Sequence, residues 1–325
     1  MRVYFDGVNF ESRTGPNSFA LRLARQLTLM GHELADPCDY DVALVFIQPT
    51  HLLRRDRPFV QRLDGIWMKP EQHAAGMNAG IRAAYDAAAS VVWQSQFDHA
   101  MAHRWLGVRE GHVIHNGVPL QERLCVSPGL RGIRRSHERV FVCSANWHPQ
   151  KRLGANIELY RRVRTAGKSC LIVLGSNPDI ELVRNRGDER IFFMGSVSHE
   201  QCMEVYSIAD WMIHLAWLDH CPNTVVEALS VGTPVVCSSE GGTRELLEDR
   251  GGKGDLGRGL LVGEEKPFAY GLNDYDNPPS LSRQISTIDP QFAGGDAPWP
   301  RFDVSSLSIE LCAQRYAAVL QSVLR

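Results

Sequence analysis

The chain has 325 residues, which is more than one hydrophobic core usually supports, so two domains are expected. Its 44% hydrophobic and 22% charged residues are typical of a globular protein. A formal net charge of -2 gives no global reason to expect nucleic acid as a partner.

Targeting and redox features are sparse. No apolar run is long enough to span a bilayer, and the first residues, MRVYFDG, are typical of a strand rather than of a signal peptide. The eight cysteines form no CxxC pair, and Cys143, Cys170 and Cys237 lie in apolar runs where cysteine behaves as a small hydrophobe. This pattern predicts a reduced, cytoplasmic protein.

The chain opens with a predicted strand over residues 2–5, a loop over residues 6–17 and an amphipathic helix over residues 18–30. These elements make half of a βαβ unit, in which ligands collect at the carboxyl end of the strand. The sequence around Gly15, GPN, is not the GxGxxG fingerprint, so a dinucleotide is not favoured. A plain turn that needs glycine is the alternative for Gly15.

Two metal-like patterns occur, and neither favours a metal site. The Asp-x-Asp triplets at residues 39–41 and 274–276 have no third oxygen ligand nearby. His99 and His103 stand one turn apart on a helix predicted over residues 95–106. No glutamate follows the first histidine and no third ligand is evident, so exposed helix histidines are expected.

Two further segments of the first half carry polar side chains at informative places. A strand within residues 57–65 ends in Asp64-Gly65, and an Asp-Gly pair is also a common turn. Residues 119–139 are polar and are predicted to link the two domains. We expect the basic cluster of this linker to be solvated, with contact to an anionic membrane surface as the alternative. The cluster consists of Arg131, Arg134 and Arg135.

The most informative stretch spans residues 213–247 and alternates strands with helix starts. A polar loop precedes Asn223, a good N-cap for a helix that opens at Thr224. A short β-branched strand follows at residues 235–237, and a Glu-Gly-Gly-Thr turn then opens a second helix at residues 244–247. Free amides and the positive dipole end make each helix start a site for phosphate or carboxylate.

An acid pair, Asp219 and Glu227, lies inside this stretch with seven residues between its members. Glu227 falls about one turn after Asn223, so its carboxylate is expected near the loop that carries Asp219. The pair, followed by A-L-x-x-G-x-P-V-V and G-G-x-x-E, resembles the donor-binding segment of retaining glycosyltransferases of family 4, within glycosyl transferases group 1. That family usually has glutamate at both positions, and Asp219 is one methylene shorter.

Other segments resemble the same family. The segment SANWHPQKRL resembles its phosphate-binding loop, with Lys151 in place, Asn146 where an arginine is usual, and Arg152 as the second charge. The segment IFFMGSV resembles the strand and glycine turn beside the nucleotide base. Asp64 stands where the family often has a histidine close to the reacting sugar, and the loop ending in Gly15 resembles one that faces the cleft.

The resemblance implies the GT-B fold, an α/β architecture in which the parallel sheets of two Rossmann-like domains face a central cleft. The acceptor domain is expected over residues 1–125 and the nucleotide-sugar donor domain over residues 138–305. An amphipathic helix over residues 306–325 is expected to cross back onto the first domain. Between them, residues 267–301 are rich in Pro, Gly, Asp and Asn and are predicted to be irregular.

The implied function is transfer of a sugar from a nucleotide-diphosphate donor to an acceptor hydroxyl, with retention and without a metal or other cofactor. Asp64 is expected to orient an acceptor hydroxyl or to support positive charge at the anomeric carbon. Glu227 is expected to hold the ribose, Asp219 a sugar hydroxyl and Lys151 the diphosphate. The implied catalytic residues are Asp64, Lys151 and Asp219. The implied donor-binding residues are Gly15, Asn146, Lys151, Arg152, Val197, Asp219, Pro222, Asn223, Thr224, Glu227, Gly241, Gly242 and Thr243.

The donor implied is a UDP- or GDP-sugar, and the acceptor a glycan, a lipid or a small molecule. Two other functions stay open. A nucleotide-sugar epimerase of the same fold needs general acid–base groups that we do not find. A non-catalytic nucleotide-binding module fits the replacements at Asp219, Asn146 and Asp64. A Rossmann dehydrogenase is disfavoured because the chain has no dinucleotide fingerprint.

Overall fold

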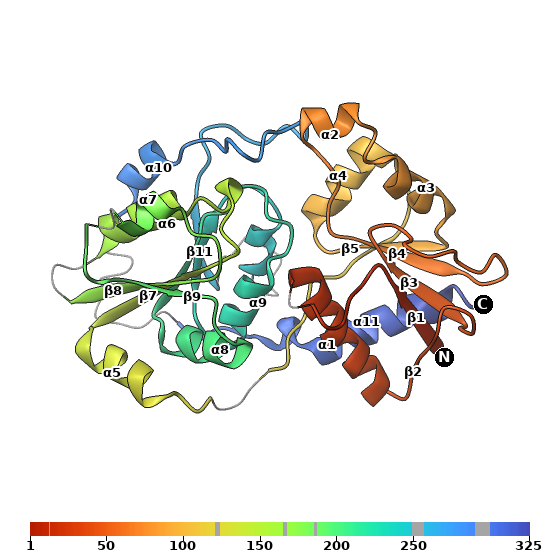
Figure 1. Cartoon of the computed structure of the whole chain (residues 1–325), viewed down its shortest axis with the longest axis horizontal. Coiled ribbons are helices and arrows are strands. Elements are labelled where there is room, and N and C mark those ends of the chain that lie inside the picture. The colour runs from red at the N-terminus through yellow and green to blue at the C-terminus, as the bar shows by residue number, and fades with distance from the viewer. Residues whose placement is uncertain (13, 121–123, 165–167, 185–186, 249–256, 290–299) are drawn as a thin grey trace.

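The computed structural model describes residues 1–12, 14–120, 124–164, 168–184, 187–248, 257–289 and 300–325. In these residues the strands form two parallel sheets of six strands each. One sheet lies in each half of the molecule, and helices cover both (Figure 1).

The first sheet has the strand order β2-β1-β3-β4-β5-β6. Its strands are β1 (Arg2–Asp6), β2 (Glu33–Leu34), β3 (Val42–Phe46), β4 (Phe59–Leu63), β5 (Ser90–Trp93) and β6 (His112–Val113). Its helices are α1 (Gly15–Leu29), α2 (Pro70–Ala74), α3 (Ala79–Ala87) and α4 (Gln96–Leu106). The order reverses at β1, so ligands are expected at the carboxyl ends of β1 and β3.

The second sheet has the order β12-β11-β10-β7-β8-β9, the doubly wound order whose reversal point lies between β7 and β10. Its strands are β7 (Arg139–Ser144), β8 (Ser169–Leu174), β9 (Ile191–Gly195), β10 (Trp211–His214), β11 (Val235–Ser238) and β12 (Gly259–Val262). The α-helices of this half are α5 (Pro128–Ser136), α6 (Leu153–Val163), α7 (Ile180–Arg184), α8 (His199–Ile208), α9 (Asn223–Ser230) and α10 (Ser282–Thr287). Three short 3-10 turns and a last helix complete the described chain, namely η1 (Pro149–Lys151), η2 (Thr243–Leu246), η4 (Ser305–Leu307) and α11 (Ile309–Ser322).

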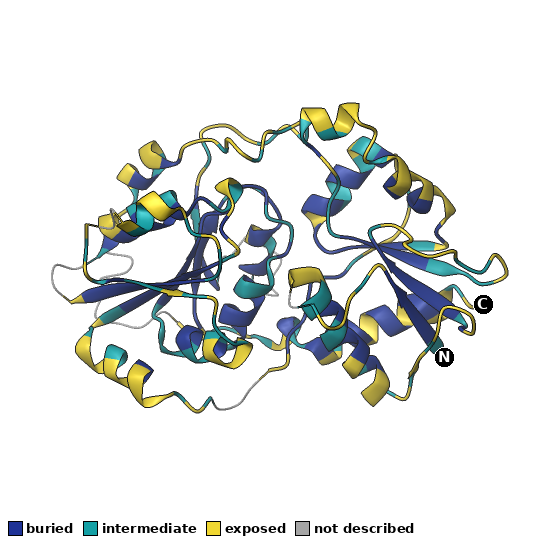
Figure 2. Ribbon diagram, viewed as in Figure 1, coloured by how far each residue is buried: buried dark blue, intermediate teal, exposed yellow. Residues whose placement is uncertain are grey.

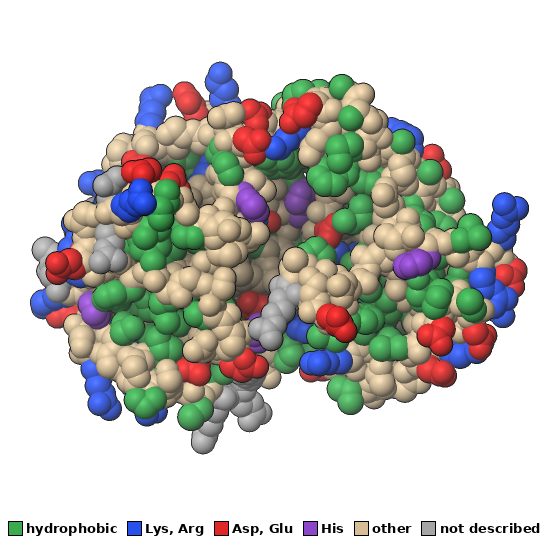
Figure 3. Space-filling model, viewed as in Figure 1, with side chains coloured by type: hydrophobic (Ala, Val, Ile, Leu, Met, Phe, Trp, Pro, Cys, Tyr) green, Lys and Arg blue, Asp and Glu red, His purple; other side chains and the backbone are tan. Residues whose placement is uncertain are grey.

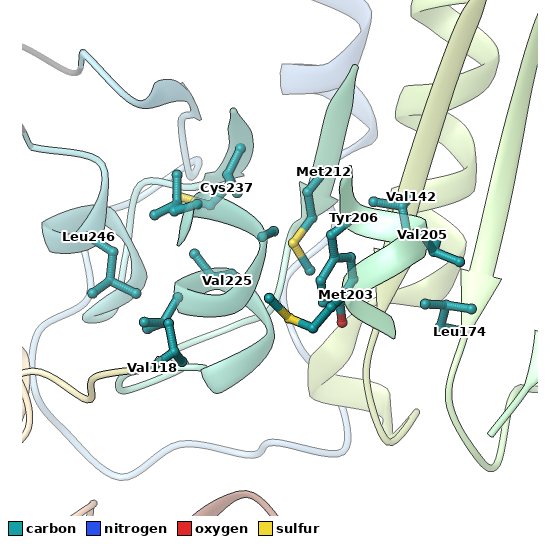
Figure 4. Close-up of a cluster of buried hydrophobic side chains, with 14 of the residues drawn as sticks. Val118, Val142, Leu174, Met203, Val205, Tyr206, Met212, Val225, Cys237 and Leu246 are labelled. Carbon is teal, nitrogen blue, oxygen red and sulfur yellow. The ribbon is translucent and has the colours of Figure 1, made fainter. Parts of the chain in front are cut away.

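The central strands are buried along both faces (Figure 2). Strand β8 reads SCLIVL and is buried at every position, as expected for a parallel strand with helices on both sides. On one face of this sheet, Met203 and Tyr206 of α8 and Val225 of α9 pack with Met212 of β10 (Figure 4). The carboxyl ends of the strands, where a ligand would bind, therefore stand on a rigid support.

The C-terminal helix α11 lies in the first half of the molecule beside α1 (Figure 1). Its Tyr316 and Leu320 share one buried cluster with Phe19 of α1. The chain crosses between the halves twice at one place, because Val118 and Ser308 pair in a parallel bridge. The first half thus consists of both ends of the chain.

A second connection joins the halves on the opposite side of the molecule, where the segment that precedes α10 passes close to α2 and α4 (Figure 1). Lys69 and Asp276 form an ion pair at 2.5 Å, and the Trp105 indole donates to the carbonyl of Tyr270 at 3.0 Å. Helix α10 corrects the prediction that residues 267–301 are irregular throughout. Of that range, residues 290–299 lie outside the described residues.

Three predicted helix starts differ from the structure. Helix α1 begins at Gly15 because Pro16 suits the first helical turn, so Gly15 is helical rather than in a turn that needs glycine. Helix α9 begins at Asn223 with Pro222 as its N-cap residue, so Asn223 is not the cap. The helix predicted after the Gly-Gly turn is only the 3-10 turn η2.

The predicted linker contains a helix, α5, which packs on the second sheet through buried Leu130. Arg134 of the basic cluster is held by Asp210, with 3.2 Å between Nη1 and Oδ2. It is therefore part of the fold rather than a solvated linker residue. Arg131 and Arg135 are exposed, and their contact with a membrane stays a prediction.

Candidate functional site

Loops after β7 and β10 meet at the reversal point of the second sheet and bring Lys151 beside Asp219. The Lys151 Nζ lies 2.5 Å from Asp219 Oδ2, and His214 Nε2 lies 3.0 Å from the same oxygen. Burial alone would raise the pKa of Asp219, but the Lys151 charge and the His214 hydrogen bond hold it well below its ordinary value. An ion pair thus stands where the strand order favours a ligand.

Buried Asn156 of α6 fixes this geometry. Its Nδ2 donates to the carbonyl oxygens of Lys151 at 3.1 Å and Arg152 at 2.7 Å. Its Oδ1 accepts from the amide of Leu215, just after β10, at 3.1 Å. One side chain therefore ties the loop after β7 to the loop after β10.

Arg152 is buried against a carboxylate near the predicted site. Its backbone is left-handed, with φ +50°, and its side chain is only 4% exposed. Both terminal nitrogens of the guanidinium contact Glu264, at 2.6 and 3.1 Å, and the group lies over the ring of Trp217. Its Nε has no partner among the described residues, and its two terminal nitrogens are held by a carboxylate rather than presented to a diphosphate. The sequence does not show that Glu264 lies here, and the donor-binding role of Arg152 stays a prediction.

Glu227, the second acid of the pair, lies in the second turn of α9 and is nearly buried. Arg22 of α1 contacts its Oε1 at 2.8 Å and His199 of α8 contacts the same oxygen at 3.3 Å. Burial would raise the pKa of Glu227, but His199 and Arg22 lower it. Among the described residues, the Arg22 Nε and Nη2 donors are buried without partners.

The start of α9 touches the first half of the molecule through Asn223. Its Nδ2 donates to the Gly15 carbonyl at 2.7 Å, and its Oδ1 accepts from Asn116 Nδ2 at 3.1 Å. Asn116 also donates to the carbonyl of Cys221 at 3.1 Å. Pro222 and Thr224 flank this contact and are half-buried. Gly15, predicted to face the cleft, therefore contacts the donor side directly.

Asp64 follows β4 and is paired with an arginine from its own strand. Arg62 Nη1 lies 3.1 Å from Asp64 Oδ2, while Nη2 donates to Gln94 and Asn116 at 3.0 Å each. The guanidinium also lies over the ring of Phe19. Asp64 is thus a largely buried, charge-compensated group at the first sheet's carboxyl edge.

The Gly-Gly turn packs against the loop of Asp219, and one of its amides bonds within the protein. The Gly242 amide donates to the Asp219 carbonyl at 2.8 Å, while the diphosphate contact expected of this turn stays a prediction. Gly241 has φ +95°, and a Cβ there would lie 2.8 Å from the same carbonyl oxygen, so only glycine fits. Thr243 is buried in η2. The four-residue η2 also lacks the length for a helix dipole.

Two predicted donor-binding residues, Asn146 and Val197, lie at the carboxyl edge of the second sheet. Asn146 is exposed, and its Oδ1 accepts from Ser176 Oγ and Asn177 Nδ2 at 2.9 Å each. Val197, after β9, is half-buried against the apolar cluster of the second sheet. Both follow strands of the second sheet at its carboxyl edge.

Contacts across the two halves surround this edge, and the surface between the halves is hollowed, with histidine and acidic side chains in the hollow (Figure 3). A separate hollow of about 880 Å³ is lined by His99, His103 and Arg109 at the amino end of β5. Ligands of parallel sheets collect at carboxyl ends, so we do not assign it a function. The two histidines are half-buried rather than exposed, with rings 3.9 Å apart against Trp93.

The remaining predictions about metals, cysteines and membranes are addressed by the described residues. Asp39 and Asp41 both bind Arg2, and no group of three or more potential metal ligands occurs in the described part of the chain. All eight cysteines are free thiols, and Cys143, Cys170 and Cys237 are buried. No described helix is both long and apolar enough to cross a bilayer.

Comparison with known proteins places the second half of the chain in a family of domains. Residues 132–273 match the family described as Glycosyl transferases group 1. The matched residues therefore form a domain of glycosyltransferase type.

A curated relative matches over part of its length. This is the N-acetyl-alpha-D-glucosaminyl L-malate synthase of Bacillus anthracis, which is 24% identical over 138 residues. The match covers 41% of this chain and 34% of that protein, so the chain matches about a third of the relative.

Solved structures match over nearly the whole chain. HepE of Anabaena, in complex with UDP, superposes with a TM-score of 0.69 at 18% identity, covering 99% of this chain and 100% of that one. The sucrose-phosphate synthase of Thermosynechococcus elongatus gives 0.69 at 15% identity, with 99% of each chain covered. WaaG, a glycosyltransferase of lipopolysaccharide biosynthesis, gives 0.63 at 14% identity, covering 100% of this chain and 97% of that one. The fold is GT-B, as the resemblance implied.

Several residues around the acid pair were not expected from the sequence. Arg22, His199 and His214 hold the acid pair, and His220 contacts Asp98 across the two halves. A lone histidine or arginine carries no local signal of a partner that lies far away in the chain. The one available signal is position, because His214 and His220 lie inside the acid-bearing stretch itself.

Proposed function

We propose that this chain is a metal-independent, retaining glycosyltransferase of the family 4 type, which moves a sugar from a nucleotide-diphosphate sugar to an acceptor hydroxyl. The observation that carries the proposal is the Lys151–Asp219 pair at the reversal point of the second sheet, with Glu227 on the helix that follows. A cation beside a helix start suits a diphosphate, and the two acids suit neutral hydroxyl groups.

In this proposal Lys151 contacts the diphosphate and offsets the negative charge that grows on it as the sugar leaves. The amide of Thr224, in the first turn of α9, adds a neutral donor to the same phosphates. Glu227 accepts hydrogen bonds from the ribose, and Asp219 from a hydroxyl of the transferred sugar. Each acid exchanges a protein cation for a ligand hydroxyl when the donor enters.

Arg22 replaces Arg152 as the second cation. Arg22 approaches Glu227 from the first half of the molecule, and two of its donors have no partner among the described residues. Entry of a ribose at Glu227 would release Arg22 toward the nearby phosphates, where a planar guanidinium binds two oxygens at once. The first half of the chain would then complete the donor site.

Retention follows if the donor supplies its own base. The bond between the anomeric carbon and the diphosphate oxygen breaks, with its electron pair moving to the diphosphate. The acceptor oxygen bonds to the anomeric carbon on the same face, and its proton passes to the departing phosphate oxygen. Asp64 helps to orient the acceptor hydroxyl, and the protein contributes position and charge rather than a covalent intermediate.

UDP-glucose is the first donor to test, with a GDP-sugar as the alternative, because the HepE structures contain UDP and UDP-glucose. The acceptor is proposed only by class, as a hydroxyl of a glycan, a lipid or a small molecule. The test measures nucleoside diphosphate release from UDP-glucose, UDP-galactose, UDP-N-acetylglucosamine and GDP-mannose, with and without EDTA. An α-linked product from an α-linked donor, seen by NMR, would support retention.

Lys151→Ala should lower kcat/KM by about 100-fold while the protein stays folded, because the leaving group loses its counter-charge. Lys168→Ala is the matched control, since Lys168 is an exposed lysine paired with Glu138. Equal activity in the two variants would remove Lys151 from the mechanism. Nucleotide binding without turnover would favour the non-catalytic module, and a new nucleotide sugar without a glycoside would favour the epimerase.

A further inference from the structure

His220, the residue after Asp219, reaches across to the first half of the molecule. Its Nδ1 is in hydrogen-bond contact with Asp98 Oδ1, in the first turn of α4. Asp98 is 1% exposed, and its Oδ2 has no partner among the described residues. The ring of Phe97 packs against the imidazole, with centroids 5.3 Å apart. The imidazole orientation is therefore fixed by the first half of the chain.

The other ring nitrogen faces the turn after β4. A Cβ on Gly65 would lie 2.9 Å from His220 Nε2, and Gly65 has φ +131°, so glycine alone leaves room for the ring. No described residue forms a hydrogen bond with Nε2, although the side chain is only 18% exposed. A fixed, unpartnered nitrogen thus stands between the loop of Asp219 and the turn of Asp64.

The surrounding charges decide which form of the imidazole is present. Burial acts against its charge, but the carboxylates of Asp98, Asp219 and Asp64 raise the pKa of His220 above its ordinary value. With Nδ1 committed to Asp98, a protonated ring presents Nε2–H as a donor. The same carboxylates would repel a phosphate, whereas a neutral hydroxyl can accept from Nε2 and donate to a carboxylate.

We propose that His220 binds a hydroxyl of the transferred sugar through Nε2–H and that Asp98 is the positioning residue that orients it. This inference rests on the proposed function and adds a sugar contact that both halves of the chain build together. The site would then be complete only when α4 and the loop after β10 are in contact.

The test compares His220→Ala, His220→Gln and Asp98→Asn with the wild-type protein, using whichever nucleotide sugar of the four-donor panel turns over. Each is also assayed with forms of that donor lacking one sugar hydroxyl. His220→Ala should lower kcat/KM for the complete donor by about 10- to 100-fold. In this variant, one of the deoxy donors should have the same kcat/KM as the complete donor, because the contact with the missing hydroxyl is already lost. His220→Gln retains a donor near Nε2 and should restore part of the loss, and Asp98→Asn should give an intermediate loss. UDP affinity should stay within about twofold in all variants, because in the proposed function the diphosphate binds at Lys151 and not at His220.

The matched control is His115→Ala, because His115 forms a similar contact across the halves, 3.1 Å from Glu245, without facing the Gly65 turn. Equal losses of activity in His220→Ala and His115→Ala would show that the sugar contact is wrong and that His220 has only a structural role. The same conclusion would follow if removal of each sugar hydroxyl lowered kcat/KM as much in His220→Ala as in the wild type. A wild-type protein that turns over no donor of the panel would instead refute the proposed function, and the sugar contact with it.

Discussion

At the scale of single residues, each carboxylate in and around the site forms an ion pair with one lysine or arginine. Lys151 pairs with Asp219, Arg22 with Glu227, and Arg152 with Glu264. The Arg152–Glu264 pair is the most buried of the three, with side chains 4% and 2% exposed against 11% and 9% for Arg22 and Glu227, so we expect a ligand to exchange with the cation at the first two pairs. Burial therefore separates arginines and lysines that look equivalent in the sequence.

Replacing Arg152 should destabilise the fold more than it perturbs donor binding. Arg152→Ala leaves Glu264 buried without a partner, which costs about 3–5 kcal/mol in the free energy of unfolding. The double variant with Glu264→Ala should recover part of that loss, because the unpaired charge is gone. Guanidinium denaturation measures both, with Lys168→Ala as an exposed control that should show no change. A stable Arg152→Ala protein with lost UDP binding would restore Arg152 to the donor site.

The depressed pKa of Asp219 predicts a pH-dependent contribution to stability. A carboxyl whose folded pKa lies below its unfolded value of about 3.9 stabilises the fold fully above that pH, and the contribution fades as the pH falls further. The stability difference between the wild type and Asp219→Asn should thus be constant from pH 8 to pH 5 and shrink below about pH 4. Urea denaturation over this range measures it. A difference that persists unchanged to pH 3 would contradict the ion pair.

At this scale the sequence indicated the acid pair and Lys151 but not their partners. The spacing of Asp219 and Glu227 within one strand–loop–helix unit is a local feature, so it is visible in the sequence. Arg22 meets Glu227 only because two sheets face each other, and no local pattern encodes that contact. Their positions on the carboxyl edges follow from topology, whereas the pairing itself follows from tertiary packing.

At the scale of elements, one side chain of the Gly-Gly-x-x-Glu run caps a helix of the other half. The Glu245 carboxylate accepts from the amides of Gln96 and Phe97, at 2.7 and 2.9 Å, in the first turn of α4. This carboxylate satisfies two free amides and complements the helix dipole. The sequence suggested Ser95 as the cap of α4, which is confirmed by its bond to the Asp98 amide, but gave no sign of Glu245.

Glu245→Ala should destabilise the protein by about 1–2 kcal/mol, because α4 loses a capping carboxylate and two amides lose their acceptor. Glu265→Ala, at an exposed position nearby in the chain, is the control and should change little. Hydrogen exchange at Gln96 and Phe97 locates the effect. Unchanged protection of these amides in Glu245→Ala would show that the contact does not hold α4.

Element boundaries were predicted well where hydrophobic patterning is continuous and less well at helix starts. The strand β8 follows from a buried apolar run, and the helix α6 carries apolar residues along one buried face. The starts of α1 and α9 were misplaced because a proline and an asparagine each fit two adjacent positions of a helix start. The helix α5 was missed because its few apolar positions lie in a strongly basic sequence.

At the scale of the whole molecule, the two halves are joined by the paired crossing at Val118 and Ser308 and by the segment beside Lys69. The amphipathic pattern of the last helix predicted that the helix forms. Only the family resemblance implied that it returns to the first half. It docks there because its apolar side chains share one buried cluster with α1 and with strands of the first sheet.

Core truncations in the two halves should act on different parts of the molecule. Leu320→Ala removes a buried side chain of α11 from the first-half cluster, and Leu229→Ala removes one of α9 from the second. Each should cost about 2–5 kcal/mol, depending on how far the cavity collapses. Hydrogen exchange should show lowered protection in α1 for the first variant and in α8 for the second. Loss of protection in α8 with Leu320→Ala would contradict the placement of α11.

The most direct test of the central claim is a thermal-shift measurement with UDP, GDP, ADP and NAD on the wild-type protein and on Glu227→Ala. A ligand that binds only the native state stabilises it by about 2.7 kcal/mol at a hundredfold excess over its dissociation constant. We predict a shift with one nucleoside diphosphate, none with NAD, and loss of the shift in Glu227→Ala. No shift with any nucleoside diphosphate, or a shift that survives the substitution, would contradict a donor site between Lys151 and Glu227.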